Sequence, residues 1–185
     1  SGFGNPANLE INLNLLNNSN LFWLPKELIL FNNCNLKRKI NFNLSKDSNL
    51  LLCENIIFGR TSMKEEFEKG YFSDFWNINV DNKLIHTEAI NTGLFEKKYL
   101  SSFSTLNNNS AVATIIIVGN KFLNKINNLS KTLTNNENTT SNYSHWDNKL
   151  IVRLLSKDSY NLKFAIDKIL SYFFEGSKIP KVWNI

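Results

Sequence analysis

The sequence predicts a mainly β protein, a β-rich body of short strands, with two α-helices in the C-terminal third. Three observations lead to this prediction. Apolar and polar residues alternate through much of the first two-thirds of the chain, which is typical of half-buried strands. Short apolar segments recur at spacings of about ten residues. Apolar residues at helical spacing occur only after Gly119.

The strands of the first part are predicted from two patterns. Strict alternation marks strands with one buried face, whereas short continuous apolar runs mark more deeply buried segments. Pro25 separates two of these runs, because proline cannot donate a hydrogen bond within a sheet. The predicted segments are 9–15, 22–24, 28–31, 36–44, 50–53 and 56–58.

A hairpin and two further strands follow. Residues 71–80 and 84–90 read as the two arms of a hairpin joined at Asp81-Asn82, a pair that favours turns. Residues 111–118 and 149–155 are apolar enough for buried strands. The polar residues 134–148, rich in Asn and Thr, are predicted to form a surface loop.

Two helices are predicted beyond Gly119. The first rests on helical spacing in residues 122–133, and the second on an amphipathic pattern in residues 162–173. Asp158-Ser159 offers an N-cap for the second helix, and Gly176 and Pro180 would end it. We therefore expect residues 1–185 to form a single domain, with a β body over about 9–118 and strand–helix units over about 111–174.

Composition narrows the classes of function. The net charge is +5, but the basic residues are scattered, and the one run of three, Lys37 to Lys39, lies in a strand whose side chains alternate. This disfavours nucleic-acid binding. Asn is far above its usual share, which we interpret as compositional drift at tolerant surface positions. The two cysteines, and the absence of a membrane-length apolar stretch or a signal peptide, predict a cytoplasmic protein.

Catalytic motifs are absent from the sequence. It contains no phosphate-binding P-loop, no GxGxxG and no GxSxG. Only His86 and His145 could act as a histidine base, and His145 falls in the predicted loop. A Cys53–His86 dyad stays open as an alternative. Two cysteines and two histidines, all far apart, do not predict a closed zinc site.

Four carboxylates lie within or beside apolar strand segments, which makes them candidates for a functional site. Glu54 is the sharpest, because it stands between the apolar runs 50–53 and 56–58. A buried charge requires a partner, a metal or water. The structural explanation is that Arg60 or a lysine pairs with the Glu54 carboxylate. The functional explanation is that Glu54 lines a polar interior route for a cation. The four candidates are Glu27, Glu54, Asp74 and Glu88.

Six segments carry a family resemblance in their order and spacing. They run over 23–31, 54–65, 70–93, 111–119, 153–159 and 180–183. Together they resemble the motifs of the urease accessory protein UreD family. The matching positions that we expect to be structural or partner-binding are Trp23, Pro25, Gly59, Arg60, Met63, Glu65, Trp76, Arg153, Asp158, Pro180 and Trp183.

This resemblance implies a fold and a function. UreD proteins are mostly β with two helices near the C-terminus, and they are not enzymes. They bind UreF, which recruits the GTPase UreG, and they dock on apo-urease as chaperones of nickel insertion, with a possible homodimer of the accessory complex. An internal polar tunnel is thought to carry the ion. The resemblance makes Glu54 and Glu88, then Glu27 and Asp74, candidates for lining a route of weak ligands, with no tight metal site and nickel only in transit.

The chain also departs from the family pattern. Lys26, Ser62, Lys64 and Lys181 stand where the family has Gln, Ala, Gly and Arg. A Gly-rich N-terminal β segment of the family is not represented, so the resemblance covers the C-terminal two-thirds, and an open sheet edge is expected. Three alternatives remain at this point: a structural adaptor with no metal role, a small Cys/His hydrolase, and a nucleic-acid binder.

Overall fold

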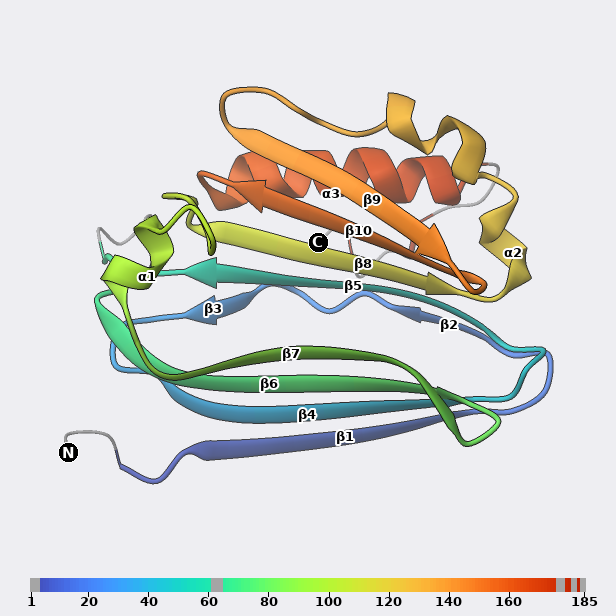
Figure 1. Ribbon diagram of the computed structural model, residues 1–185, viewed down its shortest axis with the longest axis horizontal. Helices are drawn as coiled ribbons and strands as arrows, with labels where there is room; N and C mark the ends of the chain where they lie inside the picture. The colour runs from blue at the N-terminus through green and yellow to red at the C-terminus, as the bar shows by residue number, and fades with distance from the viewer. Residues whose placement is uncertain (1–3, 61–64, 176–178, 181–182, 184–185) are drawn as a thin grey trace. The chain divides into compact units, whose positions relative to one another are not determined.

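The computed structural model describes residues 4–60, 65–175, 179–180 and 183 (Figure 1). It confirms a mainly β fold with a long helix near the C-terminus. The chain divides into two compact units, here called unit 1 and unit 2. Unit 1 comprises residues 1–20, 30–48 and 58–99, and unit 2 comprises residues 21–29, 49–57 and 100–185. Within the described ranges, no helix is long and apolar enough to cross a membrane.

Unit 1 is a four-stranded sheet. Its strands lie in the order β1 (Ala7–Leu15), β4 (Asn35–Leu44), β6 (Lys69–Val80) and β7 (Lys83–Glu96), and the short helix α1 (Lys97–Ser101) follows β7. β1, β4 and β6 are parallel, and β7 pairs antiparallel with β6. The long connections between the parallel strands carry the chain out into unit 2 and back.

The predicted alternation holds along β4. Ile40 and Phe42 are fully buried on one face, and Arg38 lies on the same face. Lys37 and Lys39 are exposed on the other face, so the basic run is split between two faces as predicted. The predicted hairpin is also confirmed, with Asp81 and Asn82 at positive φ between β6 and β7.

Unit 2 is built on a six-stranded sheet. Its main path is β2-β5-β8-β10-β9, and β3 pairs with β5 as well. The strands are β2 (Asn20–Trp23), β3 (Leu28–Leu30), β5 (Asn49–Phe58), β8 (Ala111–Val118), β9 (Thr139–Trp146) and β10 (Lys149–Ser156). The two predicted segments 50–53 and 56–58 are in fact one strand, β5, because Glu54 and Asn55 between them are also buried in extended conformation.

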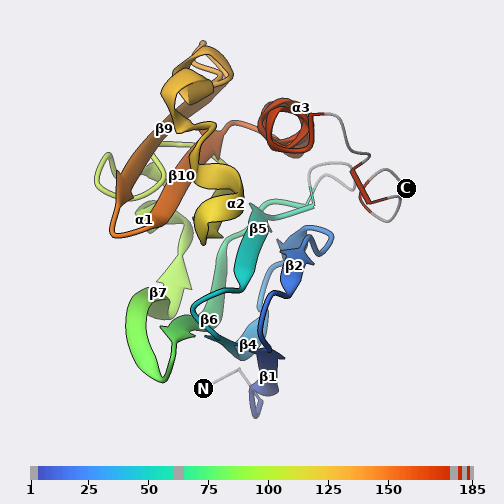
Figure 2. The ribbon, with the colours of Figure 1, turned by 90° about the vertical axis from the view of Figure 1, so that its right-hand side faces the viewer.

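Helix α3 (Ser159–Phe173) covers one face of this sheet. The Asp158 side chain accepts a hydrogen bond from the Asn161 backbone N–H at 2.7 Å, which confirms the predicted N-cap. Its apolar side, from Leu162 to Phe173, joins a cluster with alternate residues of β5, β8 and β10. Figure 2 looks nearly along the α3 axis. The predicted stop at Gly176 lies outside the described residues.

The first predicted helix is wrong in extent. Residues 122–133 form only the four-residue helix α2 (Asn120–Leu123) and the 3-10 helix η2 (Ile126–Lys131). The apolar spacing itself was correct, because Phe122, Ile126 and Leu129 are buried. Asn124 lies at the end of α2, and Asn127 and Asn128 lie within η2. Asparagine is a weak helix former, which disfavours one continuous α-helix here.

The predicted loop 134–148 is also wrong. Most of it is β9, which pairs antiparallel with β10 across a tight turn where Asp147 and Asn148 have positive φ. The strand was missed because its inward side chains, such as Thr139 and Ser141, are small and polar. They are buried through hydrogen bonds, one of them between the hydroxyls of Thr139 and Ser156 at 3.0 Å.

Candidate functional site

Glu54 belongs to a polar row on one face of the unit 2 sheet. Glu54 on β5 lies opposite Thr114 on β8, which lies opposite Arg153 on β10. The flanking residue Cys53 belongs to the apolar cluster under α3. Since successive side chains of a strand point to opposite faces, the Glu54 row lies on the face away from α3.

Hydrogen bonds hold this row in place. The Trp23 indole N–H donates to Oε1 of Glu54 at 2.6 Å, and Nη1 of Arg153 donates to Oγ1 of Thr114 at 3.1 Å. Glu54 is only 3% exposed. The indole therefore fixes the direction of a deeply buried carboxylate. Arg60, which we predicted as a partner of Glu54, instead forms its ion pair with Glu65.

A second polar group lies on the buried face of the unit 1 sheet. Arg38 on β4 and Asp74 on β6 are in register and form a two-pronged ion pair, with Nε to Oδ1 at 2.9 Å and Nη2 to Oδ2 at 2.6 Å. Both side chains are buried. The Arg38 guanidinium also lies 5.8 Å from the Trp76 ring centre. Both oxygens of Asp74 are thus engaged by a cation.

Glu88 lies beside this ion pair on the same sheet. It is directly opposite Trp76 in the β6–β7 register, so the two side chains share a face. Nε2 of His86 lies 3.4 Å from Oε2 of Glu88, and both side chains are nearly buried. The Trp76 indole N–H is buried and has no hydrogen-bond partner in the part of the chain that the structure describes. A carboxylate, an imidazole and a spare donor therefore converge here.

The chemistry open to these groups is weak cation or water binding. Carboxylate, imidazole and water are acceptable ligands for divalent nickel. Among residues 4–60, 65–175, 179–180 and 183, no group of three or more His, Cys, Asp or Glu is placed to hold a metal ion. His86 with Glu88 makes a two-ligand set, which is fewer than the three or four protein ligands of tight sites.

Glu27 lies in a different setting from Glu54. It is exposed and lines an open pocket of about 550 Å³ in unit 2. Pro25 interrupts the edge of the sheet between β2 and β3, and the pocket lies beside this interruption. The wall of the pocket also contains Lys26, Ile29, Asn55, Ile57, Ser159, Tyr160, Leu162 and Lys163. Glu54 is absent from this wall, so the two glutamates do not form one site.

The described residues of the Gly59–Glu65 motif, Gly59, Arg60 and Glu65, have structural roles. Gly59 has φ of 87°, and a Cβ there would lie 2.9 Å from the backbone oxygen of Glu65, so only glycine fits. Glu65 accepts hydrogen bonds from the Asn32 backbone N–H at 2.9 Å and from Nε of Arg60 at 2.6 Å. These contacts, the Asn32 N–H first, lower the pKa of the Glu65 carboxyl. Met63 lies outside the described residues.

The C-terminal motif residues pack against α3. The Trp183 indole N–H donates to Oδ1 of Asp167 at 2.5 Å, and Nζ of Lys163 lies 3.9 Å from the Trp183 ring centre. The backbone N–H of Trp183 donates to the Pro180 carbonyl at 2.9 Å. Trp183 is buried in the unit 2 core, which gives this motif a packing role.

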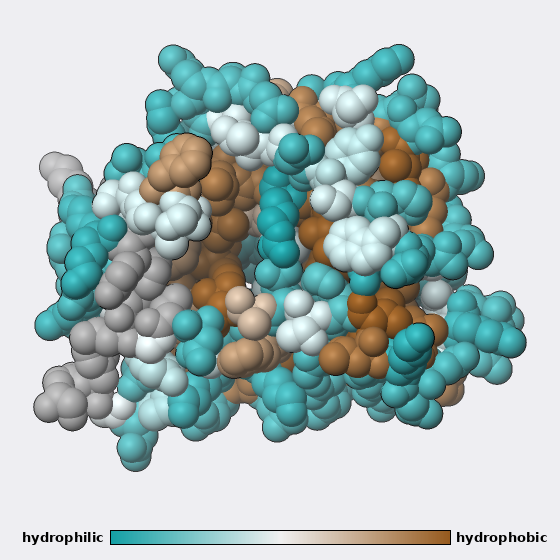
Figure 3. Space-filling view, in the orientation of Figure 1, coloured by the Kyte–Doolittle hydropathy of each residue, from teal (hydrophilic) through white to brown (hydrophobic). Residues whose placement is uncertain are grey.

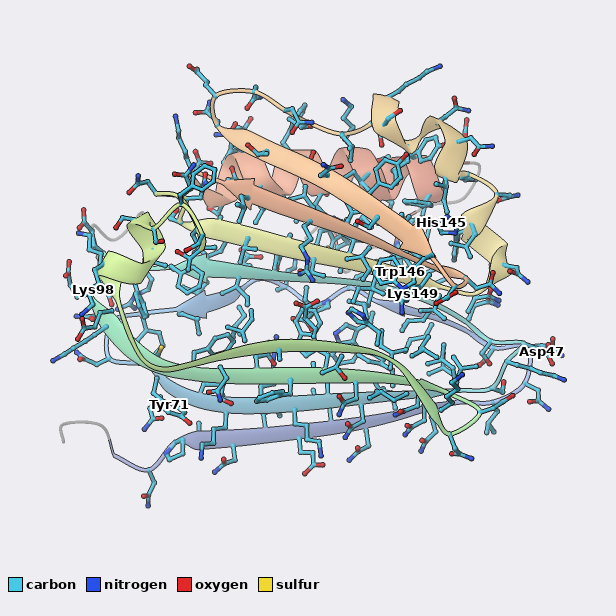
Figure 4. The ribbon with its side chains drawn as sticks, viewed as in Figure 1. Asp47, Tyr71, Lys98, His145, Trp146 and Lys149 are labelled. Atoms are coloured by element: carbon cyan, nitrogen blue, oxygen red, sulfur yellow. The ribbon has the colours of Figure 1, made fainter. Side chains whose placement is uncertain are left out.

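Cys53 is a poor nucleophile. It is completely buried, and burial, followed by the nearby Glu54 charge, raises the pKa of its thiol far above the ordinary range. His145, predicted to be in a loop, is instead an exposed residue near the end of β9, next to Trp146 and across the turn from Lys149 (Figure 4). The cysteine environment therefore argues against the hydrolase alternative.

Sequence reasoning missed two members of the polar groups. Arg38 was considered only as part of a basic run with alternating side chains, and its ion pair with Asp74 was not foreseen. His86 was considered as a catalytic base and as one of four scattered Cys and His residues, but not as the neighbour of Glu88. The spacing of His86 and Glu88, two residues apart in a strand, was a usable signal because such residues share a face.

The chain is similar to known proteins over almost its whole length. The family model described as UreD urease accessory protein matches residues 1–184. A urease accessory protein UreD of Rhizobium leguminosarum bv. viciae is 32% identical over 166 residues, which cover 88% of this chain and 59% of that protein. A urease accessory protein UreD of Dinoroseobacter shibae is 28% identical over 177 residues, which cover 96% of this chain and 61% of that protein. The chain thus spans about three-fifths of the length of these curated relatives.

Proposed function

The chain belongs to the UreD urease accessory protein family, and we propose that it acts in urease maturation as a non-catalytic scaffold. In this proposal it binds UreF, and through UreF the GTPase UreG, and it docks on apo-urease in the cytoplasm to help insert nickel. Nickel is a cargo in transit, and the chain holds no tightly bound cofactor. The deeply buried Cys53 supports a non-catalytic role.

The observation that carries the nickel role is the buried carboxylate of Glu54. A charge at 3% exposure within an apolar strand is costly unless hydrogen bonds, an opposite charge or a cation compensate it. The Trp23 indole engages Oε1 of Glu54 at 2.6 Å and so holds the carboxylate in one direction. A site that offers an ion only a few oriented carboxylate ligands binds it weakly. Weak binding lets the ion move on, as in channels, whereas a full set of ligands would retain it.

The four predicted carboxylates are not equivalent in this proposal. Glu54 and Glu88 are its principal route residues, because each lies in a mostly apolar sheet face beside other polar groups. Asp74 is neutralised by Arg38 and is better suited to supporting the fold near Glu88. Glu27, being exposed at a pocket, is better suited to first capture of the ion or to partner contact.

The test replaces the negatively charged carboxylate of Glu54 with the neutral amide of glutamine. Glu54→Gln is expected to leave folding intact and to lower the nickel content of urease roughly tenfold or more. Nickel per urease would be measured by mass spectrometry in a strain that depends on this chain, beside urease activity. Glu10→Gln, at an exposed β1 position, is the matched control. Unchanged nickel loading in Glu54→Gln would remove Glu54 from the route.

A structural adaptor with no metal role is the second candidate. The saturation of Asp74 by Arg38 favours it, because both oxygens of this carboxylate are already engaged by a cation. An adaptor predicts that Glu54→Gln and Glu88→Gln are both silent in nickel loading. It also predicts that changes to exposed apolar residues such as Phe164 disrupt complexes with partners.

A further inference from the structure

Trp23 is the neighbour of Glu54 on the adjacent strand of unit 2. Its indole N–H donates to Oε1 of Glu54 at 2.6 Å, and β2 lies next to β5 in the sheet. Phe22, the preceding residue, packs against the cluster under α3. Because successive side chains of a strand point to opposite faces, Trp23 lies with Glu54 on the face away from α3.

The residues after Trp23 fix its position. β2 ends at Trp23, and Pro25 interrupts the sheet before β3 begins. Leu24, between them, is buried in the cluster on the α3 side. The end of β2 is therefore anchored on one face by Leu24, while Trp23 reaches Glu54 on the other face.

Polar groups are few on this face of the sheet, and they are hydrogen-bonded. Thr114 lies opposite Glu54, and Nη1 of Arg153 donates to Oγ1 of Thr114 at 3.1 Å. Over β10 and β9, the strands that continue this row, hydrophilic residues cross a hydrophobic surface (Figure 3). The indole is therefore one of a small number of polar groups that set the surroundings of Glu54.

The indole differs in charge from the partner of Asp74. Both oxygens of Asp74 are engaged by the guanidinium of Arg38, which is positively charged. An indole is a donor without charge. Its hydrogen bond therefore orients one oxygen of Glu54 without adding a positive charge that would compete with a cation. A donor of this kind suits a carboxylate that has to receive a cation.

We propose that Trp23 is a positioning residue for nickel at Glu54. This inference rests on the proposed function, in which Glu54 lines the nickel route. The indole N–H holds the carboxylate in the orientation that meets the ion, so that the ion binds at one defined place on its way. Hydrogen-bond partners of metal ligands typically contribute about 10–100-fold to metal affinity or activity.

The experiment removes the indole N–H and keeps an aromatic ring. In extracts that depend on this chain for urease activation, the nickel content of urease would be measured by mass spectrometry over a series of added Ni²⁺ concentrations. Trp23→Phe is expected to raise the Ni²⁺ concentration for half-maximal loading about tenfold and to leave the maximum unchanged. A purely structural loss would lower the maximum instead, because less folded chain would be present.

Two further variants separate the hydrogen bond from packing. Trp183→Phe removes an indole hydrogen bond to another carboxylate of unit 2, Oδ1 of Asp167 at 2.5 Å, and should leave the half-maximal concentration unchanged. Replacing Trp23 by 3-benzothienylalanine keeps the shape of the side chain and puts sulfur in place of the N–H. This replacement should shift the half-maximal concentration as Trp23→Phe does.

The double variant Trp23→Phe/Glu54→Gln distinguishes this inference from the proposed function. If Trp23 acts through Glu54, the double variant should load as much nickel as Glu54→Gln alone. A loss in Glu54→Gln without a shift in either Trp23 variant would overturn the positioning role and leave the route through Glu54 intact. Normal loading in Glu54→Gln would overturn the route itself, and the positioning role with it.

Discussion

One inner strand of each sheet, β5 in unit 2 and β4 in unit 1, is buried by different means, and the difference explains where polar groups accumulate. In unit 2, β5 is buried at nine of its ten positions, and α3 supplies the apolar cover on one face. In unit 1, β4 alternates between buried and exposed positions, and hydrogen-bonded rows of asparagine side chains, here called asparagine ladders, connect its exposed face to β1 and β6. The two ladders are Asn77–Asn41–Asn12 and Asn79–Asn43–Asn14. Apolar area therefore stabilises the first strand, whereas paired polar groups contribute much of the specificity of the second.

Breaking the unit 1 ion pair is expected to give the largest effect. Arg38→Met leaves Asp74 buried without its cation, which should lower the free energy of unfolding by about 3–5 kcal/mol. Urea denaturation would measure this loss. Replacing both partners, as Arg38→Met/Asp74→Leu, should recover most of it, because no buried charge remains. A double variant no more stable than the single one would contradict this explanation.

Truncating the unit 2 core should cost nearly as much. Ile166 is fully buried under α3, and Ile166→Ala should destabilise the protein by about 2–5 kcal/mol through lost burial and a cavity. Ile166→Val should cost only about 0.5–1.5 kcal/mol. Thermal unfolding would rank the variants beside Lys168→Ala, an exposed control on the same helix. Equal losses for Ala and Val would mean that the helix is not held by packing.

Interrupting one asparagine ladder should give a smaller loss. Asn43 both accepts from Asn79 and donates to Asn14, so Asn43→Ala removes two partly exposed hydrogen bonds. We expect a loss of about 1 kcal/mol in urea denaturation. Lys39→Ala, an exposed change on the same strand outside the ladder, is the control. A loss no greater than the control's would show that the ladder contributes nothing to stability.

The Glu65 turn should show the smallest effect, and it depends on pH. The folded pKa of this carboxyl is lowered from its ordinary value of 4.5 by the Asn32 N–H and by Arg60. Its stabilisation is therefore fully present above that value and is lost as the pH falls through the lower folded pKa. The amide shift of Asn32 should titrate with a midpoint below 4.5, and Glu65→Gln should abolish the titration. A midpoint at or above 4.5 would contradict the lowered pKa.

The strands were largely predictable from the sequence because alternation and continuous apolar runs report burial directly. The hairpin at Asp81-Asn82 and the N-cap at Asp158 were predictable because local residue chemistry decides both. β9 was missed because its buried side chains are small and polar, and pattern reasoning counts such residues as loop. The helix over 122–133 was over-extended because apolar spacing says nothing about intervening asparagines.

The high asparagine content has more structural meaning than the sequence analysis assigned to it. We expected drift at tolerant surface positions, yet among the described residues six of the eight non-glycine residues at positive φ are asparagines and the other two are aspartates. Four further asparagines link the ladders across β1, β4 and β6 as donors. The alternation of hydrophobic residues and asparagines in 11–15, 40–44 and 76–80 was visible in the sequence, but its meaning depended on the parallel register, which no local signal specifies.

The candidate site was predictable in its residues but not in its partners. Glu54, Asp74 and Glu88 were found because carboxylates stand out in apolar segments. Their neighbours come from strands distant in sequence, so the Trp23–Glu54 and Arg38–Asp74 contacts required the fold. The roles of the four carboxylates in a nickel route remain predictions.

Assembly tests the proposed scaffold most directly. The chain would be expressed with and without UreF and the urease subunits, and each mixture analysed by size-exclusion chromatography. We predict a stable, stoichiometric complex, formed equally well by Glu54→Gln because that change affects cargo and not docking. A folded chain that elutes alone from every mixture would contradict the scaffold function.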